Sequence, residues 1–141
     1  MDTTTDKLLR ELKKAKDLDK FLESYHDVVD ELSLPEYLSN LLEERGTTRA
    51  EVIAAAGISS AYGYQIFSGE RSPSRETVLQ LGLGLKLNDE EMQQLLAHAR
   101  KGALYPRDRR DCVILYACHK GMSLQQVNEL LFDRDLPMFH S

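Results

Sequence analysis

The sequence predicts an all-α protein, and three kinds of local signal support that prediction. Motifs in which Ser, Thr or Asn stands three residues before Glu or Gln recur along the chain. Such capping boxes satisfy the free backbone N–H groups at helix starts. Glycines follow several periodic apolar runs, where a left-handed residue closes a helix. No run alternates apolar and polar residues regularly enough to predict a strand.

Taken in order, these signals predict a series of helices. The capping boxes are Ser33–Glu36, Thr48–Glu51, Asn88–Glu91 and Ser123–Gln126, with simpler N-caps at Ser59 and Ser74. Left-handed C-caps are expected at Gly46, Gly57, Gly69, Gly102 and Gly121. The prolines fall where helices begin or end. The predicted helices are 6–31 (a break near Asp17 is left open), 35–45, 48–56, 59–68, 74–85, 89–101, 107–120 and 123–132.

The composition is that of a globular protein with a real core. Of the 141 residues, 42% are hydrophobic and 29% are charged. No apolar run approaches the roughly 18 residues that a membrane span needs. The polar start MDTTTDKLLRELKK lacks the apolar region of a secretion signal. We therefore expect no membrane partner and a cytoplasmic location.

Residues 1–34 are predicted to form an amphipathic helical segment. Its apolar stripe comprises Leu8, Leu12, Ala15, Leu18, Phe21, Leu22, Tyr25, Val28 and Val29. The stripe can pack on its own chain, or it can pair with a second copy or with a partner protein. The sequence leaves these alternatives open.

Residues 49–68 have the pattern of a helix-turn-helix, in which the second helix enters the DNA major groove. Apolar residues stand where they would face the inside of such a motif, namely Val52, Ala56, Ile58 and Ile66. Gly57 stands in the turn, where a left-handed residue is needed, and Ser59 caps the second helix.

The stretch TTRAEVIAAAGISSAYGYQIFSGERSPSRETVLQLGLGLKL resembles the helix-turn-helix domain of phage-repressor-like (Cro/CI, or XRE-type) bacterial regulators. The matching features are the Thr48 cap, the Ala-Gly-Ile-Ser turn at 56–59, Ile66, a Gly69…Pro73 segment similar to the family's G-x-x-x-P, and a fourth helix in RETVLQLGLGL. The resemblance covers about residues 35–101 and implies a lambda-repressor-like, DNA-binding domain. Residues 102–141 resemble a helical extension of some of these regulators, with no chemistry attached.

Two positions depart from the family pattern. The family has a small residue at the position of Ile53 and an aliphatic residue at that of Gly63. Both positions lie where the two helices of the motif cross, and close packing tolerates swaps that conserve volume. We hypothesise that Ile53 fills the space that Gly63 vacates, so that Gly63 is a packing residue inside a true helix.

The resemblance implies a set of contacts to double-stranded DNA. The exposed side of the recognition helix would be Ser60, Ala61, Tyr64, Gln65 and Ser68. Gln65 suits adenine, Ala61 suits a thymine methyl group, and Ser60 suits bases or phosphate. The phosphate candidates are Arg49, Ser59 with its helix N-terminus, Tyr62, Tyr64, Arg71 and Arg75. No lysine or arginine on this helix would read guanine, so specificity would rest on A·T contacts and DNA shape.

Structural readings of the same residues stay open. Tyr62 can cover the core, Gln65 can be an idle surface residue, and Arg71 and Arg75 can be solvated charges. A second basic cluster, formed by Arg100, Lys101, Arg107, Arg109 and Arg110, can hold DNA backbone. The cations that end a helix can equally complement its dipole without a ligand.

The sequence shows no catalytic, metal or cofactor site. His26, His98, His119 and His140 are scattered, no CxxC or HExxH spacing occurs, and GLGLKL at 82–87 lacks the Lys-Ser/Thr of a phosphate loop. Cys112 and Cys118 stand six apart on one predicted helix, point to different faces and are expected to be free thiols. We therefore expect neither an enzyme nor a cofactor.

Two functional classes follow from these observations. The first is a sequence-specific regulator, dimeric on two half-sites, that represses or activates by occupying an operator. The second is a protein-interaction module that has the same fold and no DNA binding. The second class draws on the net charge of −5 and on the two additions, residues 1–34 and 102–141, whose apolar end Leu136–Phe139 can dock on a partner or on its own chain.

Overall fold

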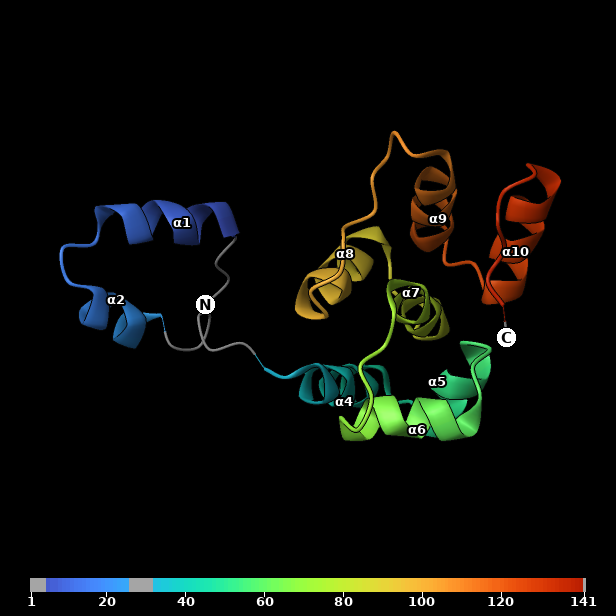
Figure 1. The fold of residues 1–141 in the computed structure, drawn as a ribbon, viewed down its shortest axis with the longest axis horizontal. Coiled ribbons are helices and arrows are strands. Elements are labelled where there is room, and N and C mark those ends of the chain that lie inside the picture. Colours follow the sequence, from blue (N-terminus) through green and yellow to red (C-terminus); the bar gives the residue numbers. More distant parts are fainter. Residues whose placement is uncertain (1–4, 26–31, 141) are drawn as a thin grey trace. The chain divides into compact units, whose positions relative to one another are not determined.

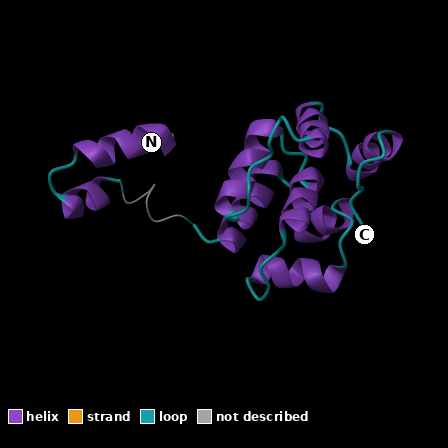
Figure 2. Ribbon diagram, turned by 45° about the horizontal axis from the view of Figure 1, so that its top comes forward, coloured by secondary structure: helices purple, strands orange, loops and turns teal. Residues whose placement is uncertain are grey.

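The computed structural model describes residues 5–25 and 32–140. Within them every regular element is an α-helix, which confirms the all-α prediction (Figure 2). The chain divides into two compact units, residues 1–32 and 33–141, and each is described by itself. The part of the predicted helix 6–31 that follows residue 25 lies outside the described residues.

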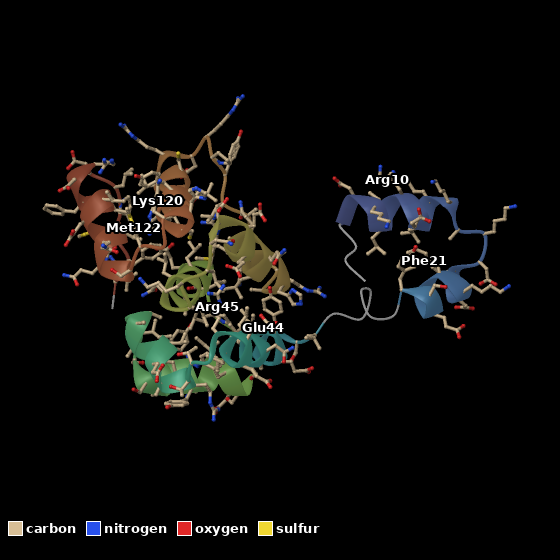
Figure 3. The ribbon with its side chains drawn as sticks, turned by 180° about the vertical axis from the view of Figure 1, so that it is seen from behind. Arg10, Phe21, Glu44, Arg45, Lys120 and Met122 are labelled. Carbon is tan, nitrogen blue, oxygen red and sulfur yellow. The ribbon has the colours of Figure 1, made fainter. Side chains whose placement is uncertain are left out.

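The described residues of the first unit form two helices, α1 (Thr5–Lys14) and α2 (Leu18–Ser24). The chain breaks between them because the Asp17 side chain accepts a hydrogen bond from the Lys20 N–H and starts a new helix. Phe21 is buried and lies between the two helices (Figure 3). This unit leaves four leucines of its apolar stripe and flank exposed, which are Leu9, Leu12, Leu18 and Leu22.

The second unit begins with α4 (Leu34–Arg45), α5 (Arg49–Ala55), α6 (Ser60–Ser68), α7 (Arg75–Gly84) and α8 (Asp89–His98). It ends with α9 (Arg109–His119) and α10 (Leu124–Asp133). In Figure 1, α4, α5 and α6 lie on one side of α7, and α8, α9 and α10 lie on the others. The predicted N-caps at Ser33, Thr48, Ser59, Ser74, Asn88 and Ser123 all accept the expected backbone hydrogen bond.

Two details of the capping predictions are wrong. Reciprocal boxes form only at Asn88–Glu91 and Ser123–Gln126 in the described helices. The Glu36 carboxylate instead accepts from the Ser33 hydroxyl, and the Glu51 carboxylate accepts from the Thr47 hydroxyl. Gly102 is not left-handed, because Arg100 takes that conformation (φ 57°) directly after α8 and closes the helix earlier.

Ile53 and Gly63 meet at the crossing of α5 and α6. Gly63 is buried inside α6, and a Cβ placed there would lie 2.6–2.7 Å from three side-chain carbons of Ile53. Contacts that close do not occur between real carbon atoms, so the isoleucine occupies the space that a side chain at residue 63 would need. Gly57, between these helices, has φ 69° and makes the left-handed turn.

The helices α9 and α10 repeat the features of α7 and α8, shifted by 35 residues. We call the pairs α7–α8 and α9–α10 the two hairpins. Each has a capping box at the start of its second helix and a left-handed residue after each helix. A buried apolar residue lies in the segment that follows each hairpin. The equivalent pairs are Arg75/Arg110, Glu76/Asp111, Lys86/Gly121, Asn88/Ser123, Gln93/Asn128, Arg100/Asp135 and Leu104/Phe139. We therefore describe the second half of this unit as an internal repeat.

The two hairpins close a ring in which α7 contacts α8, α8 contacts α9, α9 contacts α10, and α10 returns to α7. Ion pairs across the ring are reciprocal, since Arg75 binds Asp111 (3.1 Å) and Arg110 binds Glu76 (2.7 Å). At the other end, Lys86 Nζ donates to the carbonyl oxygen of its equivalent, Gly121. Equivalent groups thus meet at both ends of the ring, as around an approximate two-fold axis.

A side-chain amide fastens the segment after each hairpin. Gln93 on α8 donates to the Leu104 carbonyl and accepts from its N–H, and Asn128 on α10 does the same for Phe139. Phe139 is buried, with the Arg110 guanidinium 4.6 Å from its ring centre. The apolar end of the chain therefore docks on its own fold, which settles one alternative that the sequence left open.

The contact between Gly63 and Ile53 generates a first prediction. Gly63→Ile is expected to lower the free energy of unfolding by about 1–3 kcal/mol, because it overpacks the helix crossing. Ile53→Ala in the same chain removes the three clashing carbons and should restore much of that loss. Urea denaturation of the two single variants and the double variant measures both effects. A double variant no more stable than Gly63→Ile alone would show that the exchange idea is wrong.

The reciprocal ion pairs generate a second prediction. Asp111 is buried and accepts from both Arg75 and the Tyr105 N–H, whereas the Glu76 side chain is 48% exposed. Asp111→Asn is expected to cost about 1–3 kcal/mol, because the buried carboxylate that accepts from Arg75 and from the Tyr105 N–H loses its charge and an acceptor oxygen. Glu76→Gln should cost less than about 1 kcal/mol. Equal losses in thermal unfolding would contradict the unequal burial of these two equivalent carboxylates.

Candidate nucleic-acid interface

The outer face of α6 is small and polar. The helix buries Gly63, Ile66 and Phe67 against the core. A turn of about 100° per residue then points Ala61, Gln65 and Ser68 in the opposite direction. Ala61 and Ser68 are exposed, and Gln65 is half-buried. Ser60, at the start of the helix, is exposed as well.

A tyrosine flanks each side of this face, and an arginine lies over each tyrosine. The Arg49 guanidinium, from the start of α5, is 5.6 Å from the centre of the Tyr64 ring. The Arg71 guanidinium, from the segment after α6, is 6.0 Å from the centre of the Tyr62 ring. A cation above the face of an aromatic ring is attracted by the negative charge of the ring's π electrons. The two arginines thus border the outer face of α6 from two different segments.

Two of the serines named from the sequence form hydrogen bonds with backbone groups of their own chain. Ser59 accepts from the Tyr62 N–H and caps α6. Ser68 donates to the Gln65 carbonyl oxygen and accepts from the Glu70 N–H. Their hydroxyl groups therefore shape the two ends of the helix, while Ser60 and the Gln65 amide have no such bond among the described residues.

Arg75 does not join this surface. Its guanidinium donates to the carbonyl oxygens of Gly102 and Ala103 and pairs with Asp111. The structure therefore gives Arg75 a structural role, which is neither the phosphate contact nor the solvated charge expected from the sequence. Arg110 of the second basic cluster is tied in the same way, to Glu76 and to the Pro137 carbonyl. Arg100, Arg107 and Arg109 of that cluster are exposed.

The pairing of arginines with tyrosines is the feature that sequence reasoning missed. All four residues were named as phosphate candidates, but separately. Arg49 and Tyr64 are distant in the sequence, and no periodicity within one helix brings them together. The signal that could have found the first pair is the crossing of the two predicted helices, which sets the start of α5 beside the middle of α6.

Two other features are not found in the part of the chain that the structure describes. No group of three or more His, Cys, Asp or Glu side chains there could hold a metal ion. None of the helices in residues 5–25 and 32–140 is both long and apolar enough to cross a membrane. Comparisons with protein-family models, with curated protein sequences and with solved structures gave no match.

The two thiols of α9 differ in environment. Cys112 is exposed and Cys118 is buried, and both are free. Burial raises the pKa of the Cys118 thiol to about 11, and the nearby Asp89 carboxylate adds to the shift. Cys118 is the equivalent of Leu83 in the internal repeat and occupies a core position like it.

This difference generates a third prediction. At pH 8, roughly one Cys118 thiol in a thousand is ionised when its pKa is about 11, and the thiolate is the reactive form. Iodoacetamide is therefore expected to modify Cys112 in the native protein and to spare Cys118. In urea both should react, which serves as the control. Equal modification rates in the native protein, measured by peptide mass spectrometry, would contradict the burial of Cys118.

Proposed function

We propose that the protein is a sequence-specific DNA-binding transcriptional regulator with a lambda-repressor-like helix-turn-helix, and that α6 reads the major groove. The supporting observation is the outer face of α6, bordered by the Arg49–Tyr64 and Arg71–Tyr62 pairs. Close packing of α5 on α6 through Ile53 and Gly63 holds that face in a fixed orientation. A rigid, exposed helix with cations at its borders suits a groove between two phosphate backbones.

Each part of this face has a role in the proposed complex. Gln65 forms a bidentate contact with adenine, and Ala61 meets a thymine methyl group. Arg49 and Arg71 contact phosphates on either side of the groove, helped by the tyrosine hydroxyls. Ser60 and the N–H groups at the start of α6 supply a further phosphate contact. Arg75 is left out, because its donors are used within the chain.

The proposed regulator acts as a homodimer in the cytoplasm, without a cofactor and without catalysis. The exposed leucines of α1 and α2 are the apolar surface that a second copy would cover. A unit of about 30 residues is too small to bury its own apolar surface well, which favours such association. Dimers place two recognition helices about one DNA turn apart.

The interaction module remains the second candidate, because the net charge of −5 opposes binding to DNA. The exposed Glu70 at the end of α6 adds to that opposition. The two candidates differ in salt dependence. Binding to DNA phosphates releases counterions and weakens steeply as salt rises, whereas an interaction module has no affinity for duplexes to lose.

A fourth prediction tests the proposal with selection from random DNA duplexes. The protein is expected to enrich one motif and to lose affinity steeply with salt. Gln65→Ala should relax the preference at one base pair, by about 1–3 kcal/mol. Arg49→Ala should weaken binding to all sequences and reduce the salt slope by about one. No enrichment, with weak binding at low salt, would support the interaction module instead.

Lys120 offers a matched control for Arg49. It also lies over a tyrosine, with its ammonium 5.8 Å from the centre of the Tyr116 ring. It belongs to the end of α9, on the other side of α7 from α6 (Figures 1 and 3). Lys120→Ala removes one positive charge and is expected to leave DNA affinity unchanged. If both variants weakened binding equally, the effect of Arg49 would reflect net charge alone.

A further inference from the structure

A groove runs along α10 and the segment that follows it. It has a volume of about 640 Å³, within the range of pockets that bind ligands. Its lining residues are Leu124, Gln125, Asn128, Glu129, Phe132, Asp133 and Met138. Phe132 is 66% exposed, the largest exposed fraction among the big apolar side chains of the described residues. Leu124, at one end, packs against Gly57 in the turn between α5 and α6.

The internal repeat shows that the fold does not need this apolar surface. In the α7–α8 hairpin the equivalents of Leu124, Phe132 and Met138 are Asp89, Ala97 and Ala103. The core positions, by contrast, are apolar in both hairpins, as in Met92/Val127, Leu96/Leu131 and Leu104/Phe139. The first hairpin therefore folds with small or polar residues where the second has an exposed phenylalanine and a partly buried methionine.

The charges of the groove differ between the hairpins in the same way. Glu129 and Asp133 line the groove, and no basic side chain does. Their equivalents on α8 are Gln94 and His98, neither of them an acid. The groove of the second hairpin thus combines an apolar floor with two carboxylates. An exposed apolar patch with a polar rim marks an interaction surface.

We propose that the α10 groove is a docking site for a basic amphipathic helix of a partner protein. Apolar side chains on one stripe of that helix would cover Phe132 and Met138, and flanking lysines or arginines would pair with Glu129 and Asp133. Helices bind grooves in this way through anchors at spacings of three and four residues. The two carboxylates select a cationic helix over an acidic one. This inference stands independently of DNA binding by α6.

The occupied groove would border the helix-turn-helix. Leu124 lies between the two, because its side chain lines the groove and also lies beside Gly57 in the turn between α5 and α6. A partner held there would lie against the turn that positions α6. The proposal therefore makes the α9–α10 hairpin a binding site for a partner protein next to α6, whatever α6 itself binds.

The test uses a fluorescent synthetic helix of leucine and lysine, titrated with the full chain and followed by anisotropy. The matched probe has glutamate in place of lysine. The protein variants carry the residues of the sister hairpin, which the same fold already accommodates. Phe132→Ala with Met138→Ala removes the apolar floor, and Glu129→Gln with Asp133→His removes the acidic rim. Glu43→Gln with Glu44→Gln on α4 removes two exposed acids elsewhere, and circular dichroism checks the folding of every variant.

The lysine probe is expected to bind, and the glutamate probe is not. Each groove variant should weaken binding at least about tenfold, the acidic-rim variant should also lose its salt dependence, and the α4 variant should bind like the unaltered chain. Equal binding by all the variants would overturn the proposal, because only net charge would then matter. Sedimentation gives a second readout. If the Phe132→Ala and Met138→Ala variant lost self-association while its probe binding stayed unchanged, the groove would be an interface between copies and the proposal would be wrong.

Discussion

The second unit depends on one helix, α7, that is buried on nearly every side. All of its residues from Thr77 to Leu83 are buried. A helix so enclosed has to admit its neighbours at close range, and two glycines allow this. Met92 of α8 fills the space beside Gly82, and the α5 backbone lies against Gly84, where a Cβ would be 2.8 Å from the Val52 carbonyl oxygen. The stretch GLGLKL, which lacks the Lys-Ser/Thr of a phosphate loop, instead places two glycines where neighbouring helices pack closely.

The position of α7 links α5 and α6 to the other helices of the second unit. The buried Gln80 amide donates to the Ala56 carbonyl, at the end of α5, and to the His140 carbonyl near the end of the chain. Arg45 ties α4 to the other end of α7 through the Lys86 carbonyl and Glu91 (Figure 3). The pKa of Glu91 is lowered, first by the hydrogen bond from the Asn88 N–H and then by this contact with Arg45. The ring formed by the two hairpins therefore supports α5 and α6, which pack against it through α7.

Local chemistry made most of this fold predictable, because caps and apolar spacing act within one or two helical turns. The exchange between Ile53 and Gly63 could be inferred since both positions departed from one pattern in opposite directions. The internal repeat could not be inferred, because many of its equivalent residues differ in size or polarity, as in Leu81/Tyr116 and Ala97/Phe132. Its reciprocal bonds join residues far apart in the chain, and this is also why the sequence offered Arg75 as a phosphate contact or a solvated charge and not as part of an ion pair. The residues on the outer face of α6 could be predicted from helical spacing. The arginine–tyrosine contacts beside that face could not, because they join residues from different segments of the chain.

The central claim is that α6 presents its outer face to DNA while α7 and the ring support it from behind. Amide chemical shifts followed by NMR during titration with a selected duplex test it most directly. The account predicts that the largest changes fall on Ser60, Ala61, Tyr64, Gln65 and the Arg49 and Arg71 amides, with the buried residues of α7 and α9 unmoved. Changes concentrated on α10 or on α1, or no change at all at saturating duplex, would contradict it.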